Sequence, residues 1–249
     1  MTNRLKALVH GDSGVGKSWL GASTPGPRLI LDVEGGSHFA KAKDKEGVNV
    51  RPNAIVWDPM TEAPPTGLDP NDSVFVRVRE MAEVTYALKL LQSGQHEFNS
   101  VVLDSLTDIQ LTSRYAIRDD QKNSEVTDMR SWGMLLDEMI ELCRNFRDLT
   151  DNPIRPLWTV LVIAGSEQIE GQWSPQVQGG IRNRLGGFFD VVGFLQNEVD
   201  YKTGQRVRRM HLAQSQAWKA KDRTDDLIQH YGDHIDNPDV RDMMSVLNQ

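Results

Sequence analysis

The stretch Gly11-Asp12-Ser13-Gly14-Val15-Gly16-Lys17-Ser18 matches the phosphate-binding pattern G-x-x-x-x-G-K-[ST] at every fixed position. Its glycines let the backbone wrap closely, so that consecutive N–H groups can point at one anion. Lys17 would supply a point charge for the β- and γ-phosphates, and Ser18 a hydroxyl ligand for Mg²⁺. An apolar run at 5–10 precedes the loop and a helix-compatible run at 19–22 follows it, as the motif requires. We therefore expect the loop and Trp19 to bind ATP with Mg²⁺.

The composition is that of an ordinary globular protein. The chain has 249 residues, a net charge of −7, 39% hydrophobic residues and 25% charged residues. Its single cysteine, Cys143, excludes an internal disulfide and a cysteine-based zinc site, and favours the cytoplasm. No apolar run approaches the length that a membrane span needs, so no membrane partner is expected.

Apolar runs and helical patterns alternate along the chain, which predicts an α/β fold with a mostly parallel twisted sheet flanked by helices. Strands are expected at 28–32, 74–76, 100–105 and 157–164, and helices at 80–92 and 132–149. Residues 191–195 and 207–212 predict a C-terminal β-hairpin. Residues 112–131 are predicted to be a helix end followed by a mobile loop, and 170–187 a long glycine-rich loop. We expect one domain over 1–249, with a polar tail at 224–249 that holds one helix near 240–247.

Two acidic residues follow predicted strands at the edge where parallel sheets bind ligands. Glu34 follows the strand 28–32 and could activate the water that attacks the γ-phosphate. The alternative, a turn residue or an acid at a helix N-terminus, has equal weight on the residues alone. Asp104 ends the strand 100–105 and is the candidate for the second Mg²⁺-side ligand, against the alternative of a plain strand-end acid.

The segment 181–223 is basic, with nine Lys and Arg against four Asp and Glu. Arg182 and Arg184, in the glycine-rich loop, suit a contact with single-stranded nucleic acid as well as they suit an unstructured surface loop. The run Lys219-Ala220-Lys221-Asp222-Arg223 could neutralise a phosphate on this subunit or on a neighbour.

With these features, nearly the whole chain resembles the ATPase core of the RecA/RadA recombinase superfamily, and most of all its phage-encoded Sak-type single-strand annealing ATPases. The resemblance lies in the ordered set of the phosphate loop, Leu31-Asp32-Val33-Glu34-Gly35, Val101-Val102-Leu103-Asp104-Ser105, residues 161–168 and Lys219–Arg223. It implies that Glu34 is the catalytic glutamate, acting with Lys17. It also implies that Lys221 and Arg223 reach a neighbour's nucleotide. The γ-phosphate sensor of these proteins falls at about Ser166, with Gln168 two residues on.

The resulting expectation is a Mg²⁺-dependent, DNA-stimulated ATPase that binds single-stranded DNA and promotes annealing or strand exchange in phage recombination. The resemblance implies a homo-oligomer with an interfacial nucleotide site. A single-strand DNA-binding protein is a candidate partner, and the host cytoplasm is the expected location if the chain is phage-encoded. Two alternatives stay open: a small-molecule or nucleotide kinase, and an ATP-switched adaptor in DNA replication or recombination.

Overall fold

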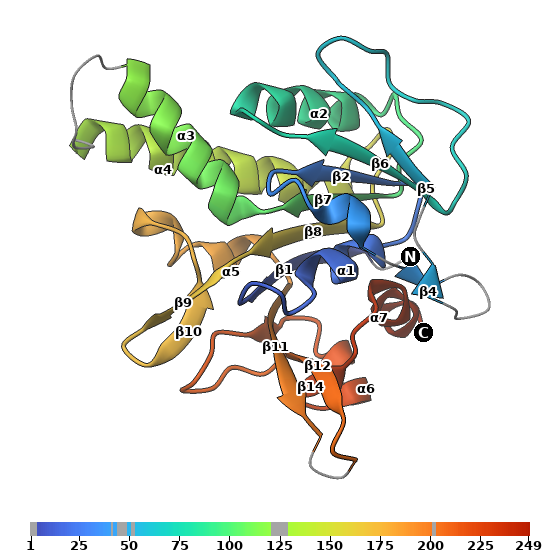
Figure 1. The fold of residues 1–249 in the computed structure, drawn as a ribbon, viewed down its shortest axis with the longest axis vertical. Helices are drawn as coiled ribbons and strands as arrows, with labels where there is room; N and C mark the ends of the chain where they lie inside the picture. The colour runs from blue at the N-terminus through green and yellow to red at the C-terminus, as the bar shows by residue number, and fades with distance from the viewer. Residues whose placement is uncertain (1–3, 41, 44–48, 51–52, 121–128, 201–202) are drawn as a thin grey trace.

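The strand that leads into the phosphate loop, β1 (Leu5–Gly11), lies inside the main sheet (Figure 1), which has ten strands. The computed structural model describes residues 4–40, 42–43, 49–50, 53–120, 129–200 and 203–249. The strand order is β14-β12-β11-β1-β8-β7-β2-β6-β5, and β13 pairs with β11. The strands from β11 to β5 run parallel, whereas β12, β13 and β14 are antiparallel to their neighbours. The predicted mostly parallel α/β sheet is confirmed.

The other strands of this sheet are β2 (Arg28–Asp32), β5 (Asn53–Val56), β6 (Asp72–Arg77), β7 (Ser100–Asp104), β8 (Thr159–Ala164), β11 (Val191–Val199), β12 (Arg206–His211), β13 (Lys221–Asp222) and β14 (His234–Asp236). Two small antiparallel pairs lie outside it: β3 (Ala42–Lys43) with β4 (Asn49–Val50), and β9 (Ser166–Ile169) with β10 (Gln172–Pro175). The helices are α1 (Lys17–Ala22), α2 (Met81–Ser93), α3 (Leu106–Asp120), α4 (Met129–Asp148), α5 (Leu185–Phe188), α6 (Asp226–Tyr231) and α7 (Val240–Leu247).

Successive side chains of β1 point to opposite faces of the sheet, and each face has its own apolar core. Leu5, Ala7 and Val9 pack in the cluster that includes residues of α1, α6 and α7. Leu8 packs in the other cluster, which includes residues of α2, α3, α4 and α5. His10 is two residues after Leu8 in β1, so its side chain points to the same face of the sheet as that of Leu8. This face is opposite the one that α1 covers.

One loop prediction is partly wrong and one is wrong. Residues 112–120 form the last part of α3, which lies beside α4 in Figure 1 and ends as a helix end was predicted to. Residues 129–131, predicted to be loop, are the first residues of α4. The rest of that predicted loop, 121–128, lies outside the described residues. The glycine-rich stretch 170–187 contains β10, a 3₁₀ turn at Gly179–Ile181 and α5. Ile181 and Leu185 are buried in the core, and their burial holds this stretch in a defined structure. From the sequence alone, the many glycines of the stretch favour the prediction of a loop.

The C-terminal hairpin and the last helix follow the predicted pattern: β11 and β12 pair antiparallel, and α7 covers 240–247. The tail also contains α6 and β14, which were not predicted from the sequence. Ile235 of β14 and Leu227 of α6 are buried in the cluster around α1, so the polar tail is packed onto the sheet.

Cys143 lies on the buried face of α4, and burial raises the pKa of its thiol to about 12. Because the thiolate is the reactive form, we expect an aromatic disulfide reagent at pH 8 to label the native protein orders of magnitude more slowly than the protein in denaturant. Absorbance of the released thiolate measures both rates. Equal rates would contradict the packed position of Cys143.

Candidate active site

The phosphate loop joins the end of β1 to the start of α1, and its backbone requires glycine at two positions. Gly14 and Gly16 have φ values of 77° and 98°, in the left-handed region that side chains with a Cβ avoid. Lys17 is buried, and its Nζ donates to the carbonyls of Gly11 at 3.0 Å and Asp12 at 2.8 Å. These two bonds hold the ammonium over the loop.

Ser18 and Asp104 lie together, as their sequence positions predict. The Ser18 hydroxyl donates to Asp104 Oδ2 at 2.7 Å, which joins the start of α1 to the end of β7. Asp104 is buried, and burial raises the pKa of its carboxyl. Its other oxygen, Oδ1, is buried with no hydrogen-bond partner among the described residues.

Asp32 and Ser37 complete this polar cluster, although neither was among the site residues predicted from the sequence. Asp32 lies opposite Asp104 in the register of β2 and β7. Ser37 Oγ lies 2.9 Å from Asp32 Oδ1 and 2.8 Å from Asp104 Oδ2. The signal that could have found Asp32 is its place at the end of a strand expected beside that of Asp104.

Glu34 follows β2, and its N–H donates to the carbonyl of Asp104 at 3.4 Å. Its side chain lines a cavity of about 250 Å³ together with Lys17, Ser18, Trp19 and other residues of the phosphate loop and of the segment after β2. The structure therefore brings the predicted loop, Mg²⁺-side and glutamate positions to one place.

The carboxyl of Glu34 has a raised pKa. The first cause is partial burial, and the next is the negative charge of Asp104, followed by that of Asp108 on α3. A base must be ionised to act, so turnover is expected above this raised pKa and lost as the pH falls through it. We expect Asp108→Asn to move the acid limb of the kcat/KM profile to lower pH, because it removes a neighbouring negative charge. An unchanged limb would mean that another group titrates there.

Arg208 of β12 packs against the phosphate loop, which the sequence did not suggest. Its guanidinium carbon lies 5.1 Å from the centre of the Trp19 ring, and burial lowers its pKa. A Cβ added to Gly16 would meet Arg208 Cδ at 2.9 Å, so this side chain lies directly against the loop. Arg208 thus supports both the loop and Trp19, a residue that lines the cavity.

We expect Arg208→Ala to weaken ATP binding by about five- to thirtyfold, since a partly desolvated cation–π contact contributes roughly 1–2 kcal/mol. Arg208→Lys keeps the charge but loses the flat guanidinium, so it should recover only part of the affinity. Arg206→Ala is the matched control, because Arg206 is an exposed arginine on the same strand. Titration calorimetry with a non-hydrolysable ATP analogue measures all three; an Arg208→Ala affinity equal to that of the control would remove this role.

The two sensor candidates have other partners. The Ser166 hydroxyl lies 2.7 Å from Nδ1 of His10, and Gln168 Nε2 donates to the carbonyl of Gly171 at 3.2 Å. A third polar side chain, Gln176, lies over the end of β8: a Cβ added to Gly165 would come within 2.5 Å of its Oε1. No motif in the sequence indicates Gln176. It lies at this edge because the β9–β10 hairpin brings the chain back to the end of β8.

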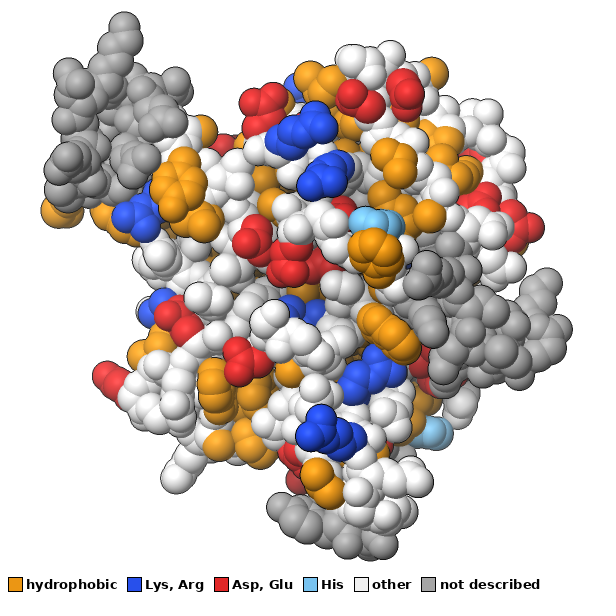
Figure 2. Space-filling view, viewed as in Figure 1, with side chains coloured by type: hydrophobic (Ala, Val, Ile, Leu, Met, Phe, Trp, Pro, Cys, Tyr) orange, Lys and Arg blue, Asp and Glu red, His pale blue; other side chains and the backbone are white. Residues whose placement is uncertain are grey.

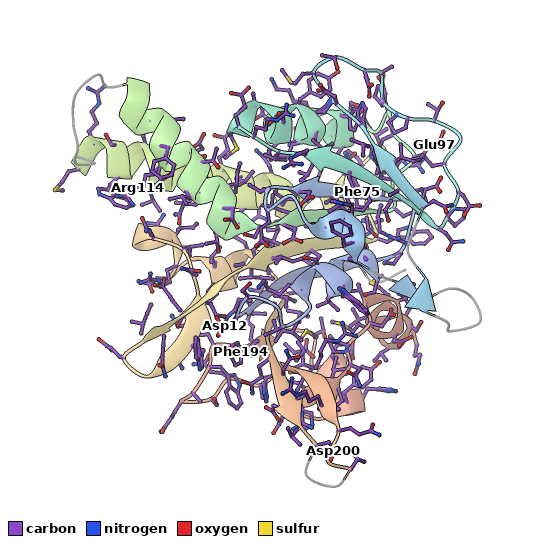
Figure 3. The ribbon with its side chains drawn as sticks, in the orientation of Figure 1. Asp12, Phe75, Glu97, Arg114, Phe194 and Asp200 are labelled. Carbon is purple, nitrogen blue, oxygen red and sulfur yellow. The ribbon has the colours of Figure 1, made fainter. Side chains whose placement is uncertain are left out.

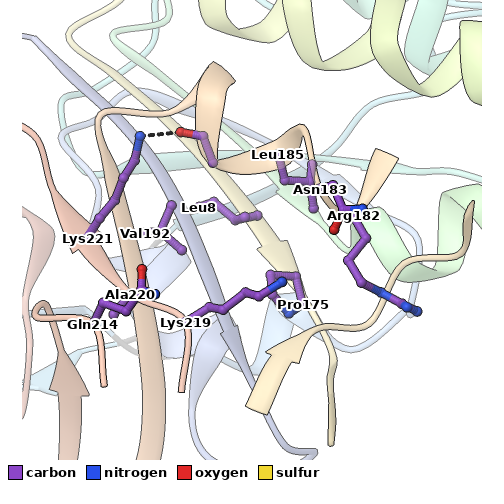
Figure 4. Close-up of a pocket in the computed structure, with 11 residues that line it drawn as sticks. Leu8, Pro175, Arg182, Asn183, Leu185, Val192, Gln214, Lys219, Ala220 and Lys221 are labelled. Atoms are coloured by element: carbon purple, nitrogen blue, oxygen red, sulfur yellow. Dashed lines mark hydrogen bonds between the residues drawn. The ribbon is translucent and has the colours of Figure 1, made fainter. Parts of the chain in front are cut away.

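The basic residues predicted to act on a neighbour or on DNA lie elsewhere. Lys221 and Arg182 line a second cavity of about 230 Å³, shown in Figure 4, which shares no lining residue with the first. Lys221 donates to the Gly186 carbonyl, and Arg223 donates to Asp190 Oδ1 at 3.0 Å. Arg182 pairs with Glu167, and Arg184 is exposed.

The charges on the outer surface are mixed. Figure 2 shows acidic side chains near the centre of one face, with basic side chains both above and below them. Over the described part of that face the basic residues form no continuous track. The net charge of −7 is consistent with this mixture. A polyanion on this face could therefore bind only at one of these separate groups of basic side chains.

Comparison with known proteins identifies one family. The sequence profile described as an AAA domain matches residues 3–224. No curated protein matches the chain. Among solved structures, a prototypical ATPase from the type III secretion system of pathogenic bacteria is similar, at 15% sequence identity and a TM-score of 0.40. The match covers 77% of this chain and 52% of the other, so the chain spans about half the length of that ATPase. Among the described helices, none combines the length and apolarity that a bilayer span needs.

Proposed function

The chain belongs to the AAA-domain family of P-loop ATPases, and from this premise we propose that it hydrolyses ATP with Mg²⁺, binds single-stranded DNA and promotes annealing or strand exchange in phage recombination. The observation that carries the hydrolysis part is the convergence of Lys17, Ser18 and Glu34 on one cavity, with Asp104 bonded to Ser18. Recombination rests on the resemblance to Sak-type ATPases and on the basic segment 181–223.

Ser18 and Asp104 fit Mg²⁺. The ion prefers oxygen ligands and is usually held by one or two carboxylates together with substrate phosphates. The unpartnered Asp104 Oδ1 and the Ser18 hydroxyl supply such oxygens. The described residues contain no group of three or more His, Cys, Asp or Glu side chains that could hold a metal without a nucleotide. When bound, the ion would neutralise charge on the β- and γ-phosphates.

The residues of the proposed site have separate roles in the reaction. The loop N–H groups and Lys17 bind the phosphates. Glu34 orients a water and accepts its proton while the water oxygen bonds to the γ-phosphorus and the bond to the β-phosphate oxygen breaks, releasing ADP and phosphate. Lys221 and Arg223, which line or flank the other cavity, would act on the nucleotide of a neighbouring subunit.

A mixing experiment tests whether the site spans two subunits. We expect Glu34→Gln and the double variant Lys221→Ala/Arg223→Ala each to be inactive alone. Mixed, they recover part of the turnover, because some interfaces then combine an intact Glu34 with intact cations. Size analysis with ATP, with and without single-stranded DNA, follows assembly. No recovery in a mixed oligomer would contradict the interfacial site.

The proposed binding of single-stranded DNA is tested separately. Single-stranded DNA should stimulate turnover of the unaltered protein, and Arg184→Ala should weaken both DNA binding and stimulation. Arg144→Ala is the matched control, since Arg144 is an exposed arginine on α4. Fluorescence anisotropy of a labelled oligonucleotide measures binding at stated salt, because phosphate contacts depend on it. A protein that hydrolyses ATP but neither binds DNA nor responds to it would remove the recombination role.

A further inference from the structure

His10 stands directly before the phosphate loop, and its side chain is fully buried. Its Nδ1 lies 2.7 Å from Ser166 Oγ and its Nε2 lies 2.7 Å from the carbonyl oxygen of Lys219. A carbonyl can only accept, so Nε2 must carry the proton. Nδ1 is then an acceptor, and the Ser166 hydroxyl donates to it. The two contacts thus determine the tautomer of the ring.

The ring stays neutral at physiological pH. Burial lowers the pKa of His10 to about 4, so both contacts persist at pH values well above 4. Phe194 of β11, labelled in Figure 3, lies opposite His10 in the strand register with a ring-centre distance of 5.2 Å. Trp173 and Trp218 stack against Phe194 in turn. The imidazole is therefore held in one orientation.

Lys219 is the residue where three parts of the chain meet. Its N–H donates to the carbonyl of Trp173 in β10 at 2.9 Å, and its carbonyl accepts from His10 in β1. Two residues on, Lys221 and Asp222 pair with β11 as β13. The side chains of Lys219 and Lys221 both line the second cavity, as Figure 4 shows. One buried imidazole thus joins the end of β1 to the backbone that carries these cations.

We propose that His10 is a positioning residue that, through its Nε2–H bond to the Lys219 carbonyl, holds the Lys219–Arg223 segment in register with the phosphate loop. This inference rests on the proposed function, in which Lys221 and Arg223 complete the nucleotide site of a neighbouring subunit. A displacement of about 1 Å in such groups lowers turnover up to a hundredfold without touching the bound nucleotide. His10 then links each subunit's own phosphate loop to the cations that it offers to the next.

Two substitutions separate the two contacts of the ring. A glutamine amide nitrogen reaches about as far as Nε2, so His10→Gln keeps a donor for the Lys219 carbonyl. An asparagine oxygen lies about where Nδ1 does, so His10→Asn keeps the acceptor for Ser166 and loses the contact with Lys219. We expect His10→Gln to retain turnover within about threefold. His10→Asn should lose about tenfold or more in kcat, with KM and ATP affinity little changed.

Hydrogen exchange gives a readout that does not depend on turnover. His10→Asn should increase exchange in the peptide that holds residues 213–223, whereas His10→Gln and Ser166→Ala should leave it near that of the unaltered protein. ¹⁵N NMR of the unaltered protein should show a neutral His10 ring protonated at Nε2 from pH 6 to 8. Equal exchange in the Gln and Asn variants, or an Nδ1–H tautomer, overturns the inference.

The same experiment separates this inference from the proposed function. If the segment is released in His10→Asn but turnover persists, His10 positions the segment and the proposed role of Lys221 and Arg223 fails. If turnover of Lys221→Ala/Arg223→Ala is lost while both His10 variants behave alike, the proposed function stands and the inference fails. If neither His10 variant folds, as far-ultraviolet circular dichroism reports, the NMR tautomer in the unaltered protein still decides.

Discussion

Glu34→Gln is expected to lower ATP turnover by at least about a hundredfold while ATP affinity stays within about twofold, because a positioned general base contributes roughly 10²–10⁴ to the rate. The glutamine keeps the size of the side chain but cannot accept a proton from water. Lys17 and Ser18, which share the cavity with Glu34, are untouched, so the phosphates should still bind. Phosphate release under single-turnover conditions, together with calorimetry on the ATP complex, measures the two quantities separately.

Glu141→Gln is the matched control, because Glu141 is an exposed glutamate on α4 away from the cavity. It should leave both quantities unchanged. Retained turnover in Glu34→Gln would show that Glu34 is a turn residue and not the base. If turnover is lost but DNA annealing is intact, the protein is an ATP-switched adaptor. Phosphate transfer to a small acceptor in preference to water would instead identify a kinase.

Lys17→Ala is expected to weaken ATP binding by about thirtyfold or more. The Lys17 ammonium is buried and directed over the loop by the Gly11 and Asp12 carbonyls. Loss of one partner of a buried charged contact costs roughly 2–5 kcal/mol, and about 1.4 kcal/mol corresponds to tenfold in affinity. A ligand that binds the native state raises the melting temperature, so ATP should stabilise the unaltered protein and not Lys17→Ala.

Lys89→Ala, an exposed lysine on α2, controls for the loss of one positive charge. It should bind ATP like the unaltered protein. The ligand-free melting temperature of Lys17→Ala shows whether the loop carbonyls need the ammonium for stability. A variant that still gains stability from ATP would place the phosphates elsewhere than on this loop.

Regular elements with strong local patterns could be predicted from the sequence. The apolar runs that became β2, β7 and β8 are long enough to identify a buried strand, and α7 begins at Val240 directly after Asp239, whose side chain accepts from the Arg241 N–H. The stretch 170–187 could not be predicted, because its order comes from burial of Ile181 and Leu185 against other elements.

What the sequence determines by itself about this protein is the phosphate loop and the strand ends around it. The physical reason is local. Gly14 and Gly16 adopt positive φ values, which favour glycine, and Ser18 follows Lys17 on the first turn of a helix. Only the tertiary structure decides the partners of these groups. His10 bonds to residues 156 and 209 positions away, and Arg208 reaches Gly16 from β12. Such pairs depend on strand order, which no spacing within the sequence encodes.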